Sequence, residues 1–499
     1  MTAKKLLRET LLLSVGAFWM RGLGLFCSMW LTKRLGTRTL GLSQLVWTVY
    51  GFAGTLCCAG VRLAVTQLCA RAAAGGYSGR KILRFCLMWA LAAGSFCAAA
   101  LNAFAPAIAA SLLHEARLAP ALARAAVGLP FLAMSSALYG FYTARSRLIY
   151  LTGLQCAEQL VSIGLTVLLV RQTADSFTAA AALAAASTAT EIFAFAAAVC
   201  FLPRDGAGEP APVRPRTFLR IVLPSAISGT AAAGLRAIQE ISIPAMLAAW
   251  GLTESEALSA YGAVGGIVYP ILFFPAAVLT SLSIALVPEL TGAYAKHDYP
   301  RMRRLCETTL RETVAFSAVC CFFVRAFAAE LTASFFGDAS RGALLALFSP
   351  MILLAYLDLI TDSMLRSIDR PLHATAGGVI DAAFCLLLAR LLVPRYGLGG
   401  LVAAVLAAKL LNLSMSLIWL ASSLSLRFSA RRDLLPLLLA YVSAAAAKAV
   451  FPAGQRASLF CHAVLTLLIF ICLTAAQHPF KRLRKNGKHG TKPMLPAER

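Results

Sequence analysis

The chain has 499 residues, of which 59% are hydrophobic and 14% are charged, and its formal net charge is +24. A soluble protein of this length would carry about 25% charged residues, so the composition excludes a set of soluble domains. The basic residues lie in short segments between apolar stretches, so nucleic-acid binding is not expected. Apolar stretches of about 20 residues, long enough to cross a ~30 Å hydrocarbon core, recur along the chain. The sequence predicts an all-α polytopic membrane protein.

We predict fourteen transmembrane helices, arranged as two six-helix lobes around a central cleft and followed by a C-terminal helix pair. They are expected at residues 9–32, 43–69, 84–110, 118–142, 150–170, 177–202, 217–249, 259–288, 308–328, 343–365, 373–393, 398–424, 434–451 and 457–476. If the N-terminus is inside, the inner segments hold most of the 46 Lys and Arg residues. By the positive-inside rule, both termini are expected to be cytoplasmic.

The clearest change of composition is "PRDGAGEPAPVRPR", which separates two long apolar blocks. Parallel repeats with the substrate held between them are a common transporter plan. The predicted parts are an N-terminal lobe (1–202), a cytoplasmic linker (203–216), a C-terminal lobe (217–425), two additional helices (426–476) and a basic cytoplasmic tail (477–499).

The segment "GAVGG" lies in the predicted eighth helix and places Gly262 and Gly266 one turn apart. Small residues at this spacing let two helices approach closely in a membrane. We interpret the pair as a helix contact, with compositional chance as the alternative.

Three arginines lie within apolar stretches, where a charge is costly. Arg21 is about 18 Å into the first helix and has no partner on that helix, which favours a role in the cleft. Arg236 is also central, and could instead pair with Glu240 one turn away. Arg62 could extend its side chain to the inner headgroups. Guanidinium groups bind phosphate with two parallel hydrogen bonds, so Arg21, Arg236 and Arg62 are the candidate substrate-binding residues for an anionic substrate.

Four acidic residues within the predicted helices are candidates for ion coupling: Glu158, Asp358, Asp362 and Asp381. Asp358 and Asp362 share a helix face and could bind a proton or Na⁺. The alternative for that pair, which we prefer, is a salt bridge to Arg366 one turn further on. Coupling to an H⁺ or Na⁺ gradient or to the membrane potential is therefore considered.

No carboxylate pair lies beside a nucleophile, and neither a metalloprotease motif nor a phosphate-binding loop occurs. The fourteen cysteines form no CxxC pair, so a zinc site is unsupported. We therefore expect no catalytic residues, no metal, no cofactor and no enzymatic activity.

The segment "RGLGLFCSMWLTKRLGTRTLGLSQLVWTVYGF" resembles the first hairpin of bacterial polysaccharide-biosynthesis flippases in the multidrug/oligosaccharidyl-lipid/polysaccharide exporter superfamily. The stage V sporulation protein B group is the most similar branch. "YGAVGGIVYPILFFPAAVLTSLSIALVPELTGAYAKHD" resembles the eighth-helix signature of that group. "SMLRSIDRP", "PRYGLGGLVAA" and "AEQLV" also match in place. The helix-one arginine of the family pattern falls on Arg21, whereas the resemblance gives no support for a role of Arg62, Arg236 or Asp381.

The resemblance implies a transport protein of the bacterial cytoplasmic membrane that moves a polyprenyl-pyrophosphate-linked saccharide, such as lipid II, across it. The group is associated with peptidoglycan of the spore cortex and thus with the cell wall and sporulation. The expected partners are this lipid-linked substrate and membrane lipids, and a monomer is expected. The alternatives are a multidrug or cation exporter with an acidic, aromatic-lined cleft, a non-transporting scaffold for spore or envelope assembly, and a membrane glycosyltransferase.

Overall fold

The protein is built from helices. The computed structural model describes residues 3–75, 77–145, 147–173, 175–202, 215–368, 371–424, 430–450, 463–464 and 466–468. Within these residues every regular element is helical, which confirms the predicted all-α class. The α-helices are α1 (Ala3–Cys58), α2 (Val61–Ala74), α3 (Arg80–Ala107), α4 (Ala119–Ala126), α5 (Leu129–Ala144), α6 (Leu148–Val170), α7 (Ser176–Cys200), α8 (Pro215–Trp250), α9 (Glu254–Ala263), α10 (Tyr269–Phe273), α11 (Ala276–Ala295), α12 (Tyr299–Ala326), α13 (Ala328–Phe336), α14 (Gly342–Phe348), α15 (Met351–Ser367), α16 (Pro371–Leu424) and α17 (Ala430–Val450). Short π or 3-10 segments lie at Ile108–Leu112, Ala116–Leu118, Val264–Val268 and Ala339–Arg341.

The described helices are those of a multi-pass membrane protein. Eight segments are long and apolar enough to cross a bilayer, or up to eleven if each of three bent helix pairs forms one span. The count of fourteen stays a prediction. The predicted tail at 477–499, nearly all of the linker at 203–216 and most of the last helix at 457–476 lie outside the described residues.

Two helices are each long enough for two spans and break at a glycine. α1 contains the first predicted helix and most of the second, and α16 contains the predicted helices at 373–393 and 398–424. The breaks are at Gly36 (φ 76°) and Gly397 (φ 57°). A residue with a Cβ atom adopts positive φ at a cost that glycine avoids. Each long helix therefore consists of two helical segments joined at one non-helical glycine.

The second predicted helix, at 43–69, is not continuous. α1 ends at Cys58, and α2 begins at Val61 after Gly60, which has a φ of 71°. A Cβ atom on Gly60 would lie 2.9 Å from backbone atoms of Val222 in α8, so this close approach requires glycine. Non-helical backbone at membrane depth is tolerated where it is buried in protein or lines a polar cavity. At Gly60 the close packing of α8 covers the break.

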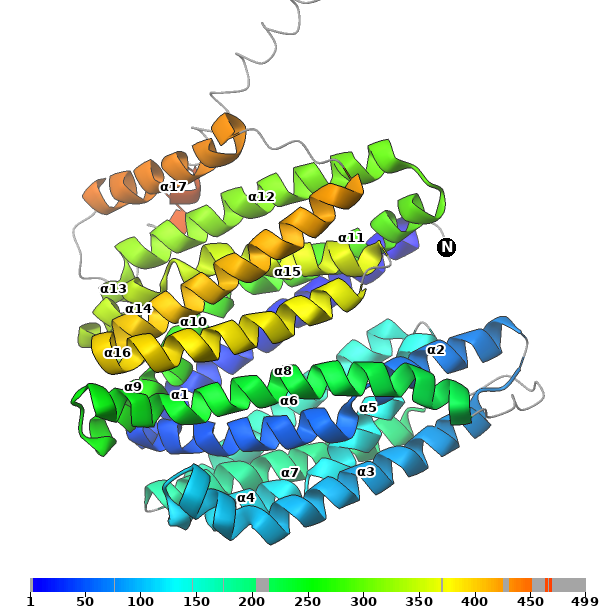
Figure 1. Ribbon diagram of the computed structural model, residues 1–499, viewed down its shortest axis with the longest axis horizontal. Helices are drawn as coiled ribbons and strands as arrows, with labels where there is room; N and C mark the ends of the chain where they lie inside the picture. The colour runs from blue at the N-terminus through cyan, green and yellow to red at the C-terminus, as the bar shows by residue number, and fades with distance from the viewer. Residues whose placement is uncertain are drawn as a thin grey trace, which may run out of the picture. The chain divides into compact units, whose positions relative to one another are not determined.

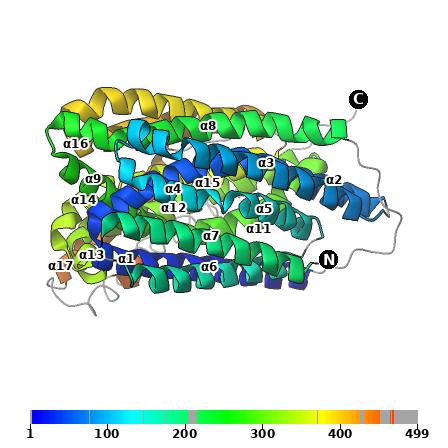
Figure 2. The ribbon, with the colours of Figure 1, turned by 90° about the horizontal axis from the view of Figure 1, so that it is seen from below.

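α7 packs against four neighbouring helices, α1, α4, α5 and α6, through small side chains. Figures 1 and 2 both show α7 beside α4 and α6. Its buried positions are mostly alanine, including Ala180, Ala184 and Ala194. Small residues bring helix backbones close together in a membrane. This close packing fixes the polar side chains of α5, α6 and α7 relative to one another.

α1 and α9 approach each other at glycines. A Cβ atom on Gly262 would overlap the Thr37 carbonyl oxygen and the Gly41 backbone. Ser28 Oγ donates a hydrogen bond to the Gly266 carbonyl oxygen at 2.6 Å. Such backbone contact between helices is possible only without a side chain. The predicted helix contact of Gly262 and Gly266 is confirmed.

The chain forms two compact units. The first contains Met1–Met302 and Asp358–Leu424, and the second contains Arg303–Leu357 and Ser425–Arg499. In the second unit, buried Ala318 of α12 and Ala440 of α17 form a small apolar core. The predicted division into two lobes, a linker and a helix pair stays a prediction. All the sites described below lie in the first unit.

Candidate functional site

Arg21 joins α1 to the end of α10. Its Nη1 donates a hydrogen bond to the carbonyl oxygen of Phe273 at 2.7 Å. In a continuous helix the amide of Ala277 would donate to Phe273, but the break before α11 directs it to Phe274 instead. A buried carbonyl without a partner is costly, and the guanidinium group satisfies this one. In this structure Arg21 therefore stabilises a helix break.

Arg62 lies in the first turn of α2, directly after the break at Gly60. Its side chain is exposed and lines a cavity of about 460 Å³. It forms no salt bridge with any residue that the structure describes. This guanidinium group therefore borders the cavity and is not neutralised by a described carboxylate.

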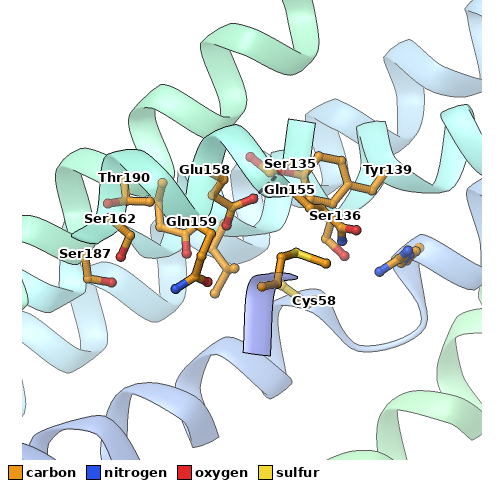
Figure 3. A pocket seen from close by; sticks show the side chains of 14 residues that line it. Cys58, Ser135, Ser136, Tyr139, Gln155, Glu158, Gln159, Ser162, Ser187 and Thr190 are labelled. Atoms are coloured by element: carbon orange, nitrogen blue, oxygen red, sulfur yellow. Dashed lines mark hydrogen bonds between the residues drawn. The ribbon is translucent and has the colours of Figure 1, made fainter. Parts of the chain in front are cut away.

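This cavity, which we call the polar pocket, is lined by residues of α1, α2, α5, α6 and α7. Three lining residues are Met20, Cys58 and Leu132, and the other eleven are polar. The polar ones are Arg62, Ser135, Ser136, Tyr139, Gln155, Glu158, Gln159, Ser162, Ser187, Thr190 and Glu191. Figure 3 shows Glu158 and Gln159 of α6 between the hydroxyl groups of α5 and those of α7.

The polar pocket holds hydrogen-bonding groups that the protein leaves partly unused. Tyr139 Oη donates to Glu158 Oε2 at 2.7 Å. Ser135 is 2% exposed, and its hydroxyl has no hydrogen-bond partner among the described residues. Burying a polar group without a partner costs about 1–3 kcal/mol. The pocket is therefore expected to contain water or a polar ligand.

A second charged site links α15 and α16. Lys409 Nζ donates to Asp381 Oδ2 at 2.8 Å and to Asp358 Oδ2 at 3.2 Å. Asn412 Nδ2 donates to Asp358 Oδ1 at 2.6 Å, and Arg236 Nη2 of α8 lies 3.9 Å from Asp381 Oδ2. We call these five residues the ion cluster. Two cations balance two carboxylates, which is how buried charges are usually tolerated.

The ion cluster contradicts the alternative pairing of Arg236 with Glu240 and the expected pairing of Asp358 with Arg366. Arg236 pairs with Asp381, whereas Glu240 accepts a hydrogen bond from Thr48 Oγ1 at 2.7 Å. α8 and α16 run side by side (Figures 1 and 2), which brings Asp381 within reach of Arg236. The expected salt bridge to Arg366 forms with Asp362 at 3.8 Å. Asp358 is wrongly placed in that bridge, because Lys409 lies closer to it.

The sequence interpretation assigned no role to Lys409. The signal was present, because Lys409 is the lone charge in the apolar stretch at 398–424. A charge at that depth is rare unless it faces a partner. The partners lie 51 and 28 residues away along the chain, so only the helix packing identifies them.

A second cavity of about 340 Å³ lies between α1, α8, α9 and α16. Trp47, Tyr261 and Tyr269 contribute aromatic rings to it, and Glu240 contributes a carboxylate. We call it the aromatic pocket. An anionic, aromatic-lined cavity is suited to an organic cation.

A search for metal ligands gives no group of three or more His, Cys, Asp or Glu residues within the described part of the chain. The cysteines described there are all free thiols.

Comparisons with known proteins agree with this architecture. The family described as "Polysaccharide biosynthesis protein" matches residues 6–288. Stage V sporulation protein B of Bacillus subtilis (strain 168) is 24% identical over 423 residues, which is 81% of each chain. The structure of "Lipid II flippase MurJ, inward closed conformation" has a TM-score of 0.71 at 11% identity, covering 94% of this chain and 99% of that one.

A second solved structure, an inward-facing multidrug resistance MATE family transporter of the MOP superfamily, has a TM-score of 0.64 at 12% identity. The alignment covers 83% of this chain and 98% of the transporter chain. At such low identity these two structures show the fold alone. The family match spans more than half of the 499 residues, and the chain therefore belongs to the polysaccharide biosynthesis protein family.

Proposed function

We propose that this protein is a flippase, not an enzyme. It moves a polyprenyl-pyrophosphate-linked saccharide, such as a lipid II-like precursor or a polysaccharide unit, across the bacterial cytoplasmic membrane by alternating access. The polar pocket carries this proposal, because a cavity with eleven polar lining residues within apolar helices gives a hydrophilic headgroup a place inside the membrane. The family match and the fold of a lipid II flippase support the same substrate class.

Of the three candidate arginines, Arg62 is the best placed for the pyrophosphate group in this structure. It faces the polar pocket without a salt bridge to any described residue, whereas Arg21 binds a backbone carbonyl and Arg236 lies beside Asp381. A guanidinium group can give a phosphate oxygen pair two parallel hydrogen bonds. Arg21 and Arg236 would join the substrate site only if transport releases them from these contacts.

We assign ion coupling to Glu158. Asp358 and Asp381 share Lys409, and Asp362 lies near Arg366, so these three carboxylates already have cationic partners. Glu158 accepts a hydrogen bond from Tyr139 and has no salt bridge with a described residue. A carboxylate at the edge of a hydrated cavity can exchange a proton with it, which would couple flipping to an H⁺ gradient or to the membrane potential. In the ion cluster, the ammonium group of Lys409 already supplies the positive charge that a bound Na⁺ would supply, so we do not assign Na⁺ coupling to it.

The aromatic pocket favours a second candidate function, export of an organic cation. Glu240 and three aromatic rings form the kind of cavity that such a cargo requires. The MATE-like fold is consistent with this alternative.

One experiment separates the two functions. The full chain is reconstituted into proteoliposomes with a fluorescent polyprenyl-pyrophosphate saccharide, and the fraction of label that an external quencher cannot reach is followed. Parallel vesicles receive ethidium. Flipping of the lipid with no ethidium uptake supports the proposal, and ethidium uptake without flipping replaces it with export. In cells, depletion of the protein should cause lipid-linked precursor to accumulate on the cytoplasmic face of the membrane. We place both termini of the protein on that same face.

A further inference from the structure

We propose that the polar pocket is a saccharide subsite that binds the sugar next to the pyrophosphate. This inference rests on the proposed function and goes beyond it by assigning the sugar to side chains of α5, α6 and α7. It is carried by the size of the pocket, by the type of its polar groups and by the groups that remain without partners.

The pocket has the size of a small-molecule site. Its volume of about 460 Å³ lies within the ~300–1,000 Å³ range of ligand pockets. A bare ion with a few ligands would occupy only a small part of it, since one water takes up about 30 Å³ in the liquid. The volume therefore suits a polar molecule larger than an ion.

The lining matches a polyol better than a cation or an apolar ligand. Amides from Gln155 and Gln159 and a hydroxyl from Ser162 lie on α6, and hydroxyls from α5 and α7 face them (Figure 3). Planar amide and carboxylate groups can bond two neighbouring hydroxyls of a sugar, because they carry two polar atoms in a fixed plane. Hydroxyl side chains both donate and accept, as sugar hydroxyls do.

Several of these groups have no partner in the protein. Within the described residues, no side-chain hydrogen bond involves Gln155, Gln159 or Ser162. The Ser135 hydroxyl is buried in the wall and unpartnered. Helices packed this closely could have filled the space with alanine, as α7 does elsewhere. Buried polar groups normally have hydrogen-bond partners, and a bound ligand would supply the partners for these donors and acceptors.

The charge of the pocket suits a sugar attached to a pyrophosphate. Glu158 and Glu191 supply carboxylates on the α6–α7 side, and Arg62 supplies the cation at the start of α2. A bare anion would be opposed by the two carboxylates. The hydroxyl groups of a sugar can donate hydrogen bonds to these carboxylates while the adjoining phosphates turn toward Arg62.

The test compares two probes on the purified full chain by microscale thermophoresis. The probes are a polyprenyl pyrophosphate without sugar and the same lipid carrying one hexosamine. The wild type should bind the hexosamine lipid at least tenfold more tightly. The double variant Gln155→Leu/Gln159→Leu should bind the hexosamine lipid about tenfold more weakly, because the hydrogen bonds from both amides to the sugar disappear. Its affinity for the bare lipid should stay unchanged.

The matched control is Gln172→Leu, the same chemical change at an exposed residue beyond the end of α6, and it should keep the wild-type preference. Wild-type binding of both lipids with equal affinity overturns the saccharide subsite and leaves the flippase proposal intact. Binding of neither lipid overturns both. An equal loss for both lipids in the Gln155→Leu/Gln159→Leu variant also overturns the subsite, since the amides would then support the fold or the pyrophosphate. Thermal unfolding of each variant separates these last two causes.

Discussion

Removing the ammonium group of Lys409 should destabilise the first compact unit strongly. The Lys409→Met variant keeps the length of the side chain and leaves Asp358 and Asp381 facing each other without their shared cation. Their side chains are 13% and 7% exposed, so water can solvate neither carboxylate well. Removing one partner of a buried ion pair costs about 3–5 kcal/mol. Arg236 can offset only part of this, because it lies 3.9 Å from Asp381 and its side chain is 55% exposed.

A double-mutant cycle tests this reasoning. Asp381→Asn alone leaves the ammonium with one carboxylate and should cost less than Lys409→Met. Combined with Lys409→Met, it removes one charge of each sign, so the double variant should be more stable than the sum of the single effects by about 1–3 kcal/mol. The assay is thermal unfolding in detergent with a thiol-reactive dye, since buried cysteines of the first unit, such as Cys86 and Cys385, become accessible when it unfolds.

Lys448→Met is the matched control. Lys448 donates to the carbonyl oxygen of Ala326 from an exposed position, so its removal should cost about 1 kcal/mol or less. If Lys409→Met unfolds at the wild-type midpoint, or if Asp381→Asn adds to its effect instead of relieving it, the ion cluster does not stabilise the fold.

Three further predictions concern transport, topology and helix packing. A lysine in the Arg21→Lys variant should still donate a hydrogen bond to the Phe273 carbonyl oxygen at the end of α10. Flipping at the wild-type rate then means that Arg21 acts only at the helix break before α11. Loss of flipping with an unchanged unfolding midpoint supports pyrophosphate binding through the guanidinium fork. In a cysteine-free background, a cysteine replacing exposed Arg38 should react with an external maleimide and one replacing exposed Arg301 should not, and the reverse pattern contradicts the predicted topology. Gly262→Leu should prevent the α1–α9 contact and lower the unfolding midpoint, whereas Gly229→Leu, with nothing within 4 Å of its Cβ position, should not; equal midpoints contradict the glycine contact.

Hydropathy predicts the helices well where a turn coincides with a change of composition. The turn at Gly36 lies within "TKRLGTR", and the turn at Gly397 lies within "PRYGLGG", so charge and glycine interrupt the apolar pattern. The break at Gly60 lies within "LCCAGVRLAV", where the apolar pattern continues. A single glycine there is equally compatible with an unbroken helix. The close approach of α8 decides the matter, and local sequence does not contain it.

The partners of the charged residues are less predictable than their existence. Local spacing led to Glu240 as the alternative partner of Arg236, because i, i+4 residues share a helix face. The observed partner, Asp381, is on another helix. Asp362 and Arg366 do pair at the i, i+4 spacing. Spacing along one helix gives the possible local pairs, and the arrangement of helices selects among these and the distant ones.

The break at Gly60 and the charge at Arg62 have one physical explanation. A helix that starts at Val61 exposes amide N–H groups that have no intrahelical acceptors, and no side chain caps this end of α2. Both the amides and the guanidinium group would be costly against lipid. The polar pocket supplies hydroxyls, amides and the carboxylates of Glu158 and Glu191 on the facing helices. Because Arg62 lines this cavity, the charge that follows the break has polar side chains beside it.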